Sequence, residues 1–213
     1  MRAAWLILVG CSSPHHAGPD AAPDAYEYVP DAQCRADSIS YAAYFSDGST
    51  PLVGATLVVH GDPSRTATTD ATGLFVLCAP QGVFTVDVDG SALDGTLVEA
   101  SYGQNSGMHF PSFTPARITE VLAAAGQTYD PAKGLVVATQ LGANAMALAA
   151  AHGTTLGAYT EPPWSATGES DVLLFPNVAP GMTTLSRLAD GLSLEVAVAP
   201  AHVTWVDLPH IEL

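Results

Sequence analysis

The chain has 213 residues, of which 48% are hydrophobic and 13% are charged. This composition is typical of a globular chain with a sizeable core and excludes a chain that is disordered throughout. Six basic residues stand against 21 acidic ones, giving a net charge of −15. Nucleic acid is excluded as a partner, because phosphate binding needs clustered basic side chains and this chain has one lysine, Lys133.

The first eleven residues, MRAAWLILVGC, carry one arginine followed by an apolar run. A membrane-spanning helix needs about 20 apolar residues, so this shorter run predicts a signal peptide. Its end, Leu8 to Cys11, resembles the lipobox at which bacterial lipoprotein signal peptidase cuts before a cysteine. The resemblance implies that residues 1–10 are removed and that Cys11 carries the lipid. The alternative is an ordinary secretory signal with Cys11 there by chance.

Residues 11–33 predict a disordered, acidic tether rich in proline and alanine. They hold four prolines, small residues and acids, and they show no hydrophobic period. A lipid anchor would leave the remainder of the chain tethered to a membrane and not inserted in it. Ser12 after the cysteine, by the same resemblance, implies the outer membrane, because aspartate there signals retention in the inner membrane.

The stretch TDATGLFVLCAPQGVFTVDV, residues 69–88, predicts a β-hairpin. Residues 70–73 place aspartate first and glycine fourth, as a type I turn prefers. Residues 74–78 form a hydrophobic strand, and residues 84–88 alternate apolar and polar side chains after a second turn. That alternation is typical of a sheet with one buried face.

Further short strands are predicted upstream, two within residues 38–62 and one at residues 66–70. Short strands with turns about eight to twelve residues apart indicate an antiparallel sandwich. The segments GATLVV, TDATGLF and APQGVFTV, in this order within residues 54–86, resemble the carboxypeptidase regulatory-like domain. The resemblance covers roughly residues 35–90. It implies a transthyretin-like sandwich of about seven strands that accompanies other domains and has no catalytic residues of its own.

A second, divergent copy is predicted in the C-terminal half. LLFPNVAPGMTTL, residues 173–185, can be laid over LFVLCAPQGVFTV, residues 74–86, with an Ala-Pro pair just ahead of a glycine in both. The predicted fold is therefore all-β, with two small antiparallel transthyretin/prealbumin-like β-sandwiches at residues 34–113 and 127–213. A single larger sandwich is the alternative.

Residues 114–126 have a helical period and predict a short helix between the two sandwiches. Thr114 is a suitable N-cap, Pro115 suits the first helical position and Gly126 can end the helix. A helix of about eleven residues is unstable alone, so we expect it to pack against a sandwich.

With Cys11 lipidated, Cys34 and Cys78 remain as an even pair in an oxidising compartment. We predict that they form a disulfide, which over this interval would contribute about 4 kcal/mol on the chain-entropy model. The alternatives are a catalytic thiol and an inert buried thiol. A thiol on an apolar strand should have a raised pKa and react slowly.

The sequence lacks the motifs of the common metal and hydrolase sites. None of the seven histidines has a glutamate three residues later, and neither HExxH, GxSxG nor an EF-hand loop occurs. We therefore predict that the chain is not an enzyme and has no metal or cofactor. A weak calcium site at the acidic turns is the alternative.

Two aromatic, loop-like stretches, residues 101–113 and 159–170, are the predicted ligand-binding regions. Their rings could stack on a sugar or clasp a peptide, or they could instead cover the ends of the sandwiches or the helix. The candidate ligand contacts are Tyr102, His109, Phe110, Tyr159 and Trp164.

These features together predict a non-catalytic surface lipoprotein, a structural or protein-interaction module of the cell envelope. Its expected partners are the membrane, through the lipid anchor, and an envelope protein or a glycan. The alternatives are a carbohydrate-binding module that uses the aromatic loops and an accessory subunit of a separate secreted enzyme.

Overall fold

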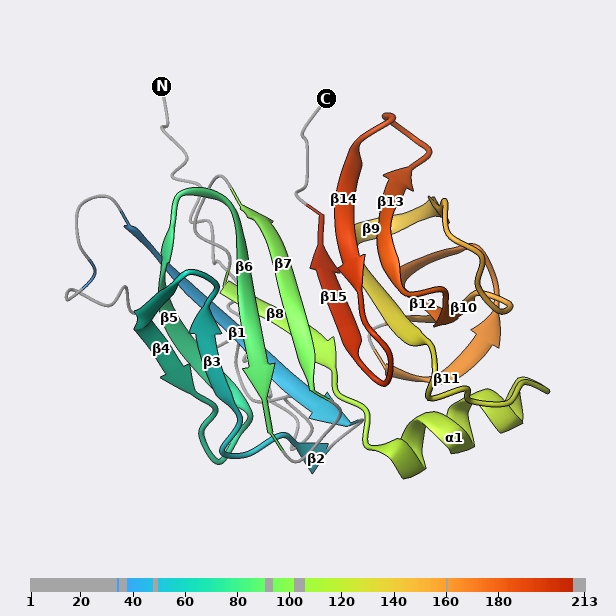
Figure 1. Ribbon diagram of the computed structural model, residues 1–213, viewed down its shortest axis with the longest axis horizontal. Coiled ribbons are helices and arrows are strands. Elements are labelled where there is room, and N and C mark those ends of the chain that lie inside the picture. The colour runs from blue at the N-terminus through green and yellow to red at the C-terminus, as the bar shows by residue number, and fades with distance from the viewer. Residues whose placement is uncertain are drawn as a thin grey trace, which may run out of the picture.

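The computed structural model describes residues 34, 38–47, 50–90, 94–101, 106–159 and 161–208. Fifteen strands and one helix lie within these ranges (Figure 1). The strands are β1 (Ser38–Asp47), β2 (Thr50–Pro51), β3 (Thr56–Val59), β4 (Asp62–Thr68), β5 (Leu74–Pro80), β6 (Gly82–Asp89), β7 (Gly95–Ser101), β8 (Ser106–Pro111), β9 (Gly134–Leu148), β10 (Leu156–Tyr159), β11 (Glu161–Ala166), β12 (Glu169–Val178), β13 (Gly181–Arg187), β14 (Ser193–Val198) and β15 (Val203–Asp207). The helix is α1 (Pro115–Ala124).

The predicted all-β class is confirmed. The predicted signal peptide, Cys11 and most of the tether lie outside the described residues. Where the chain is described, no helix is both long and apolar enough to cross a membrane.

The strands form three layers. The long sheet has the order β11-β10-β12-β9-β15-β7-β6-β3-β4. The small sheet consists of β1, β2, β5 and β8, and it lies behind the β3, β6 and β7 part of the long sheet in Figure 1. The front hairpin, β13 and β14, pairs with the end of β9 and lies in front of the β9 and β15 part of the long sheet.

Strand β15 joins the two halves of the chain. It runs parallel to β7 on one side and parallel to β9 on the other, with Val203 opposite Gly95 and Leu135. Four strands of residues 34–113, namely β3, β4, β6 and β7, therefore share one sheet with strands of residues 127–213. This pairing does not confirm two separate sandwiches, and it agrees with the single larger sandwich that the sequence left open.

The expectation of purely antiparallel sheets was wrong at three pairings. Strand β15 is parallel to both of its neighbours, and β8 is parallel to β1. Parallel neighbours need a long crossover connection, and here the chain between β7 and β15 supplies one. Period-two hydrophobicity shows which face of a strand is buried, but it does not show the direction of its neighbour.

Two hydrophobic cores lie on opposite faces of the long sheet. Strand β9 shows this by alternation, since Leu135 and Val137 belong to the first core whereas Val136 and Ala138 belong to the second. The first core includes side chains of the small sheet and of α1, and the second includes side chains of the front hairpin. A strand covered on both faces needs apolar residues in succession, which explains the run from Leu135 to Ala138.

Trp205 lies in the first core, where four strands meet. Its side chain is fully buried, and its indole N–H donates to the carbonyl oxygen of Pro111 at 2.8 Å. The indole packs edge-on against Phe45, with ring centroids 4.9 Å apart. A Cβ at Gly95 would collide with the indole ring, so glycine at this position on β7 leaves room for it. The ring thus links β15 to β1, β7 and β8.

The predicted helix is confirmed as α1. Thr114 is its N-cap, and the threonine hydroxyl accepts a hydrogen bond from the backbone N–H of Arg117 at 3.1 Å. Three apolar residues at helical spacing face the first core, and Gly126 follows the helix with φ +71°. The buried residues of the helix are Ile118, Val121 and Leu122.

The predicted turn at residues 70–73 also forms. The Asp70 carboxylate accepts hydrogen bonds from the backbone N–H groups of Thr72 at 2.7 Å and Leu74 at 3.1 Å. Gly73 has φ +78°, and a Cβ on it would collide with the carbonyl oxygen of Phe45. The turn therefore requires glycine both for its backbone conformation and for its close approach to β1.

Candidate functional site

The structure does not gather the predicted ligand contacts into one site. Tyr102 lies outside the described residues, and Tyr159 is on β10, paired in the backbone register with Glu161. Phe110 is fully buried in the first core, with its ring centroid 5.5 Å from that of Phe45. In this structure Phe110 is a core residue, and its side chain is not accessible to a ligand.

Trp164 packs in a similar way. Its side chain is half-buried against the first core, and its ring centroid lies 5.9 Å from that of Phe113. Both Phe110 and Trp164 therefore correspond to the packing alternative that the sequence analysis weighed for the aromatic loops. The sequence gives no sign of which rings face inward there, because both stretches read as loops although β8 and β11 run through them.

Among the predicted contacts whose side chains the structure describes, His109 is the one exposed on the surface. It sits on β8 opposite Tyr44 of β1, and the two rings stack with centroids 4.8 Å apart and planes 9° apart. Tyr44 is a residue that the sequence analysis missed. Its position between buried Ala43 and Phe45 places it on the outer face of the small sheet. The apolar run from Tyr41 to Phe45 has no polar alternation that could have identified it from the sequence.

Apolar side chains continue this outer face of the small sheet. Leu74 lies opposite Tyr44 in the register of β1 and β5, and Val76, two residues further along β5, is 41% exposed. A ring stack that is partly exposed and lies beside aliphatic groups can hold the apolar face of a sugar or an apolar side chain of a protein.

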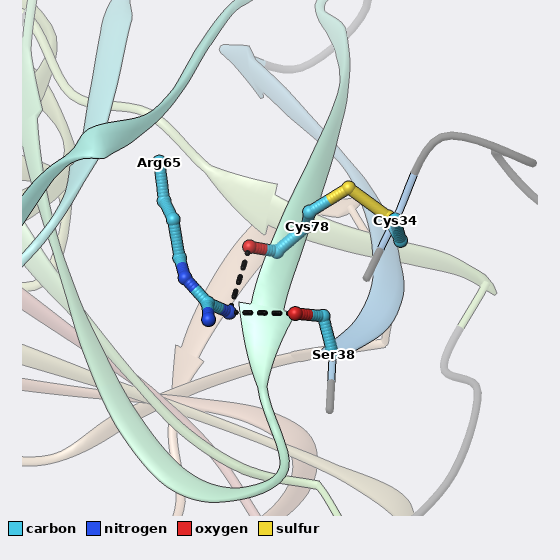
Figure 2. Close-up of a disulfide and its surroundings, with 4 residues drawn as sticks. All are labelled: Cys34, Ser38, Arg65 and Cys78. Carbon is cyan, nitrogen blue, oxygen red and sulfur yellow. Dashed lines mark hydrogen bonds between the residues drawn. A yellow bond between two sulfur atoms is a disulfide. The ribbon is translucent and has the colours of Figure 1, made fainter. Parts of the chain in front are cut away.

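The predicted disulfide is present between Cys34 and Cys78 (Figure 2). The two Cα atoms are 5.4 Å apart, and Cys78 lies opposite Ser40 in the pairing of β5 with β1. Because the two sulfur atoms are bonded to each other, neither is a free nucleophile. The bridge joins the chain just before β1 to the neighbouring strand.

Arg65 of β4 reinforces this corner from the other sheet. Its Nη1 donates to the Ser38 hydroxyl at 2.9 Å and to the carbonyl oxygen of Cys78 at 3.4 Å (Figure 2). Its Nε donates to the carboxylate of Asp62 at 3.0 Å. The arginine thus bonds to the long sheet and the small sheet where the first strand begins.

The front of β3, β4, β6 and β7 forms a second candidate surface, which we call the open face. Its side chains alternate with those of the first core, and no described element lies in front of these strands in Figure 1. The open face comprises Thr56, Val58, His60, Thr66, Thr68, Val83, Thr85, Asp87, Asp89 and Thr96.

Histidines and carboxylates meet on the open face. His60 Nδ1 lies 3.2 Å from the carboxylate of Asp87, and the Thr96 hydroxyl lies 2.9 Å from Nε2 of His202 at the start of β15. Burial lowers the pKa of His202, and the nearby carboxylates of Asp94 and Asp87 oppose that shift. Within the described ranges, no three side chains of His, Cys, Asp or Glu come together as a metal-binding group.

The pKa of Asp190 is lowered by contacts that hold a turn together. Hydrogen bonds from the Arg187 guanidinium, at 3.0 Å from Nε, and from the backbone N–H of Leu192 lower the pKa of Asp190 to about 2. Arg187 is buried at the end of β13, and both residues belong to the turn of the front hairpin. Residues with perturbed pKa values often mark functional sites, but an ion pair that holds a turn lowers a carboxyl pKa in the same way.

Comparison with protein-family models gave no match, and comparison with curated proteins gave none either. Among solved structures, the Bacillus anthracis TIE protein is similar over 79% of this chain, at 12% sequence identity and a TM-score of 0.29. This chain spans 33% of the length of that protein chain. At this TM-score the likeness indicates neither the fold nor the function.

Proposed function

We propose that this chain is a non-catalytic structural or protein-interaction module, held at the outer membrane by a lipid on Cys11 and a tether of residues 11–33. The observation that carries the proposal is the disulfide between Cys34 and Cys78. The disulfide bonds the end of the tether, just before β1, to the neighbouring strand β5. A force on the tether therefore acts on both strands and not on β1 alone. A disulfide of this kind persists in an oxidising compartment such as the envelope.

The hydrogen bonding of the perturbed carboxyl groups supports a structural role. Asp70 has a lowered pKa because the Thr72 hydroxyl and nearby backbone N–H groups donate to it inside one turn. Asp190 is held by Arg187 and Leu192 inside another turn.

For the fold, we propose that the layers formed by residues 34–113 are of the transthyretin-like type that the resemblance to the carboxypeptidase regulatory-like domain implies.

The test of this function is the mass and location of the mature protein in a bacterial host. We expect a mass that lacks residues 1–10 and includes a lipid on Cys11, recovery with the outer membrane, and no free thiol without reductant. The Cys11→Ala variant should move to the soluble fraction. An unlipidated wild type, or a Cys11→Ala variant that stays with the membrane, would refute the anchoring.

A glycan-binding module is the second candidate, and the stack of half-buried Tyr44 on exposed His109 favours it. The measurement is a glycan array with the wild type, His109→Ala and the control His152→Ala. His152 is also exposed but lies in the other half of the chain, where it packs edge-on against Phe175. Loss of binding in His109→Ala alone is expected if the stack holds a sugar, and identical profiles for the three proteins would exclude that site.

A further inference from the structure

One row of paired residues shows that the front of the long sheet is covered in one half only. From β15 to β3 the row runs through Thr204, Thr96, Asp87 and Val58. Thr204 is fully buried, and its hydroxyl donates to the carbonyl oxygen of Ala197 in the front hairpin at 2.8 Å. Thr96 is half-buried, whereas the Asp87 side chain is 57% exposed. The cover therefore reaches part of β7, where Val98 on this face is buried and Thr96 is half-buried, and the open face begins there.

The charge on the open face is one-sided. Asp87 and Asp89 project from β6, and Asp94 lies at the start of β7, close enough to act on His202. The open-face residues include no lysine or arginine. Arg65, although on the adjacent edge strand, is bonded to Asp62, Ser38 and Cys78 on the side of the small sheet. A cationic partner would therefore meet carboxylates without a competing lysine or arginine among the open-face residues, although at Asp87 it would compete with the His60 imidazole 3.2 Å away.

The spacing of the carboxylates favours an extended chain over a single ion. Asp87 and Asp89 are two residues apart on one strand, which places their Cα atoms about 7 Å apart. Alternate side chains of another extended segment have the same spacing. A second copy of this chain is disfavoured, because each copy carries a net charge of −15.

We propose that the open face docks an extended polypeptide segment with lysine or arginine at alternate positions. The segment lies along β6 beside β7, its cationic side chains meet Asp87, Asp89 and Asp94, and the apolar stems of those side chains contact exposed Val83 and the threonine methyl groups. This inference rests on the proposed function as an interaction module, and it names the partner's chemistry and the surface used.

The experiment measures binding of a fluorescent peptide of five Lys-Thr repeats by anisotropy at low salt, with a Glu-Thr peptide of the same length as the charge control. The face variant carries Asp87→Asn, Asp89→Asn and Asp94→Asn. The control variant loses the same charge from exposed acids elsewhere, through Glu120→Gln, Glu169→Gln and Glu195→Gln. Three exposed charge pairs of ordinary strength correspond to roughly a tenfold change in Kd. We therefore expect the Kd for the Lys-Thr peptide to rise roughly tenfold in the face variant and less than about twofold in the control variant.

A second measurement on the wild type removes any dependence on variant folding. A carbodiimide couples carboxylates directly to bound amines, and mass spectrometry then locates the coupled residues. Coupling at Asp87, Asp89 or Asp94 supports the docking face. Equal loss of affinity in both variants, coupling spread over other carboxylates, or no binding of the Lys-Thr peptide overturns it. An envelope partner retained equally by the face variant and the wild type would leave the interaction function standing and this surface refuted.

Discussion

At the scale of single residues, two glycines with the same backbone conformation differ in their surroundings. Gly73 has φ +78° and Gly61 has φ +81°. A Cβ at Gly61 would meet nothing within 4 Å, whereas a Cβ at Gly73 would collide with the carbonyl oxygen of Phe45. Backbone strain is therefore common to both positions, and steric overlap is confined to Gly73.

We predict that Gly73→Ala lowers the free energy of unfolding more than Gly61→Ala does. The left-handed conformation costs about 1–2 kcal/mol for alanine at either site. The collision with β1 should add at least about 1 kcal/mol at Gly73, because overpacked sites typically cost this much. Urea denaturation of the two variants beside the wild type measures the difference. Equal losses would show that the turn can move away from β1 at little cost.

The ion pair of Asp190 predicts a pH dependence of stability. Its pKa is about 2 in the folded protein and 3.8 as its ordinary value, so the unfolded chain takes up the proton first as the pH falls. The stabilisation is fully present above about pH 4 and disappears as the pH falls through 3.8 toward 2. Asp190→Asn should unfold at a lower temperature than the wild type at pH 7, and the two should converge near pH 2. A constant difference from pH 7 to pH 2 would contradict this origin.

Local residue contacts could be predicted from the sequence better than distant ones. The Asp70 turn follows from four consecutive residues, and the structure contains it. The stack of Tyr44 on His109 joins positions far apart in the chain and depends on the parallel register of β1 and β8. No local pattern specifies that register. The exposed site residue His109 was identified, but its partner was not.

At the scale of elements, the helix shows how a short segment is fixed at its ends. Thr114 caps α1, and Thr119 lies within it with its hydroxyl bonded to the carbonyl oxygen of Pro115. Both threonines are exposed. Only Thr114 satisfies a backbone N–H group that the helix leaves without a partner, that of Arg117.

We predict that Thr114→Ala destabilises the protein by about 1 kcal/mol, as loss of an N-cap typically does. Thr119→Ala is the matched control. It removes the same atoms from the helix interior, where alanine has the higher helix propensity, so it should be neutral or slightly stabilising. Thermal and chemical denaturation of both variants tests this. Similar losses in the two variants would show that the cap hydrogen bond does not explain the effect.

The positions of strands could be predicted well, and their partners could not. Alternation located β6 because it has one buried face, as its burial pattern shows. Strand β15 falls within residues 127–213, which were expected to form a sandwich of their own, but it lies between β7 and β9. All five of its residues are buried, so it has no polar face to indicate where it lies.

The two edge strands of the long sheet carry prolines. Strand β4 contains Pro63, and β11 at the opposite edge contains Pro162 and Pro163. Proline has no N–H group to donate to another strand, so it limits edge-to-edge pairing with other chains. The long sheet is therefore protected at both ends, and its open face remains the broad surface available for contact.

At the scale of the whole molecule, the shared sheet makes the two halves depend on each other. The first core contains residues of the N-terminal half together with Leu135, Val137 and Trp205 from the C-terminal half. Removal of β15 would expose one edge of β7 and open a space where the indole ring packs. The C-terminal half would lose the cover that the N-terminal half gives to the first-core faces of β9 and β15.

We predict that neither half folds alone, although two separate sandwiches would each do so. Fragments 34–126 and 127–208 should show weak near-ultraviolet circular dichroism and no cooperative unfolding, whereas fragment 34–208 should unfold in one transition by calorimetry. The reason is that each half would expose core residues which the other half now buries. The free energy of unfolding of a small domain is only a few kcal/mol, so such a loss of burial is enough to unfold it. If the two halves are mixed and recover the cooperative transition, the parallel pairing of β15 with β7 can assemble without a covalent link. A sharp transition in fragment 34–126 by itself would instead restore the sandwich of residues 34–113 as an independent domain and reduce the β15 contact to an interface between domains.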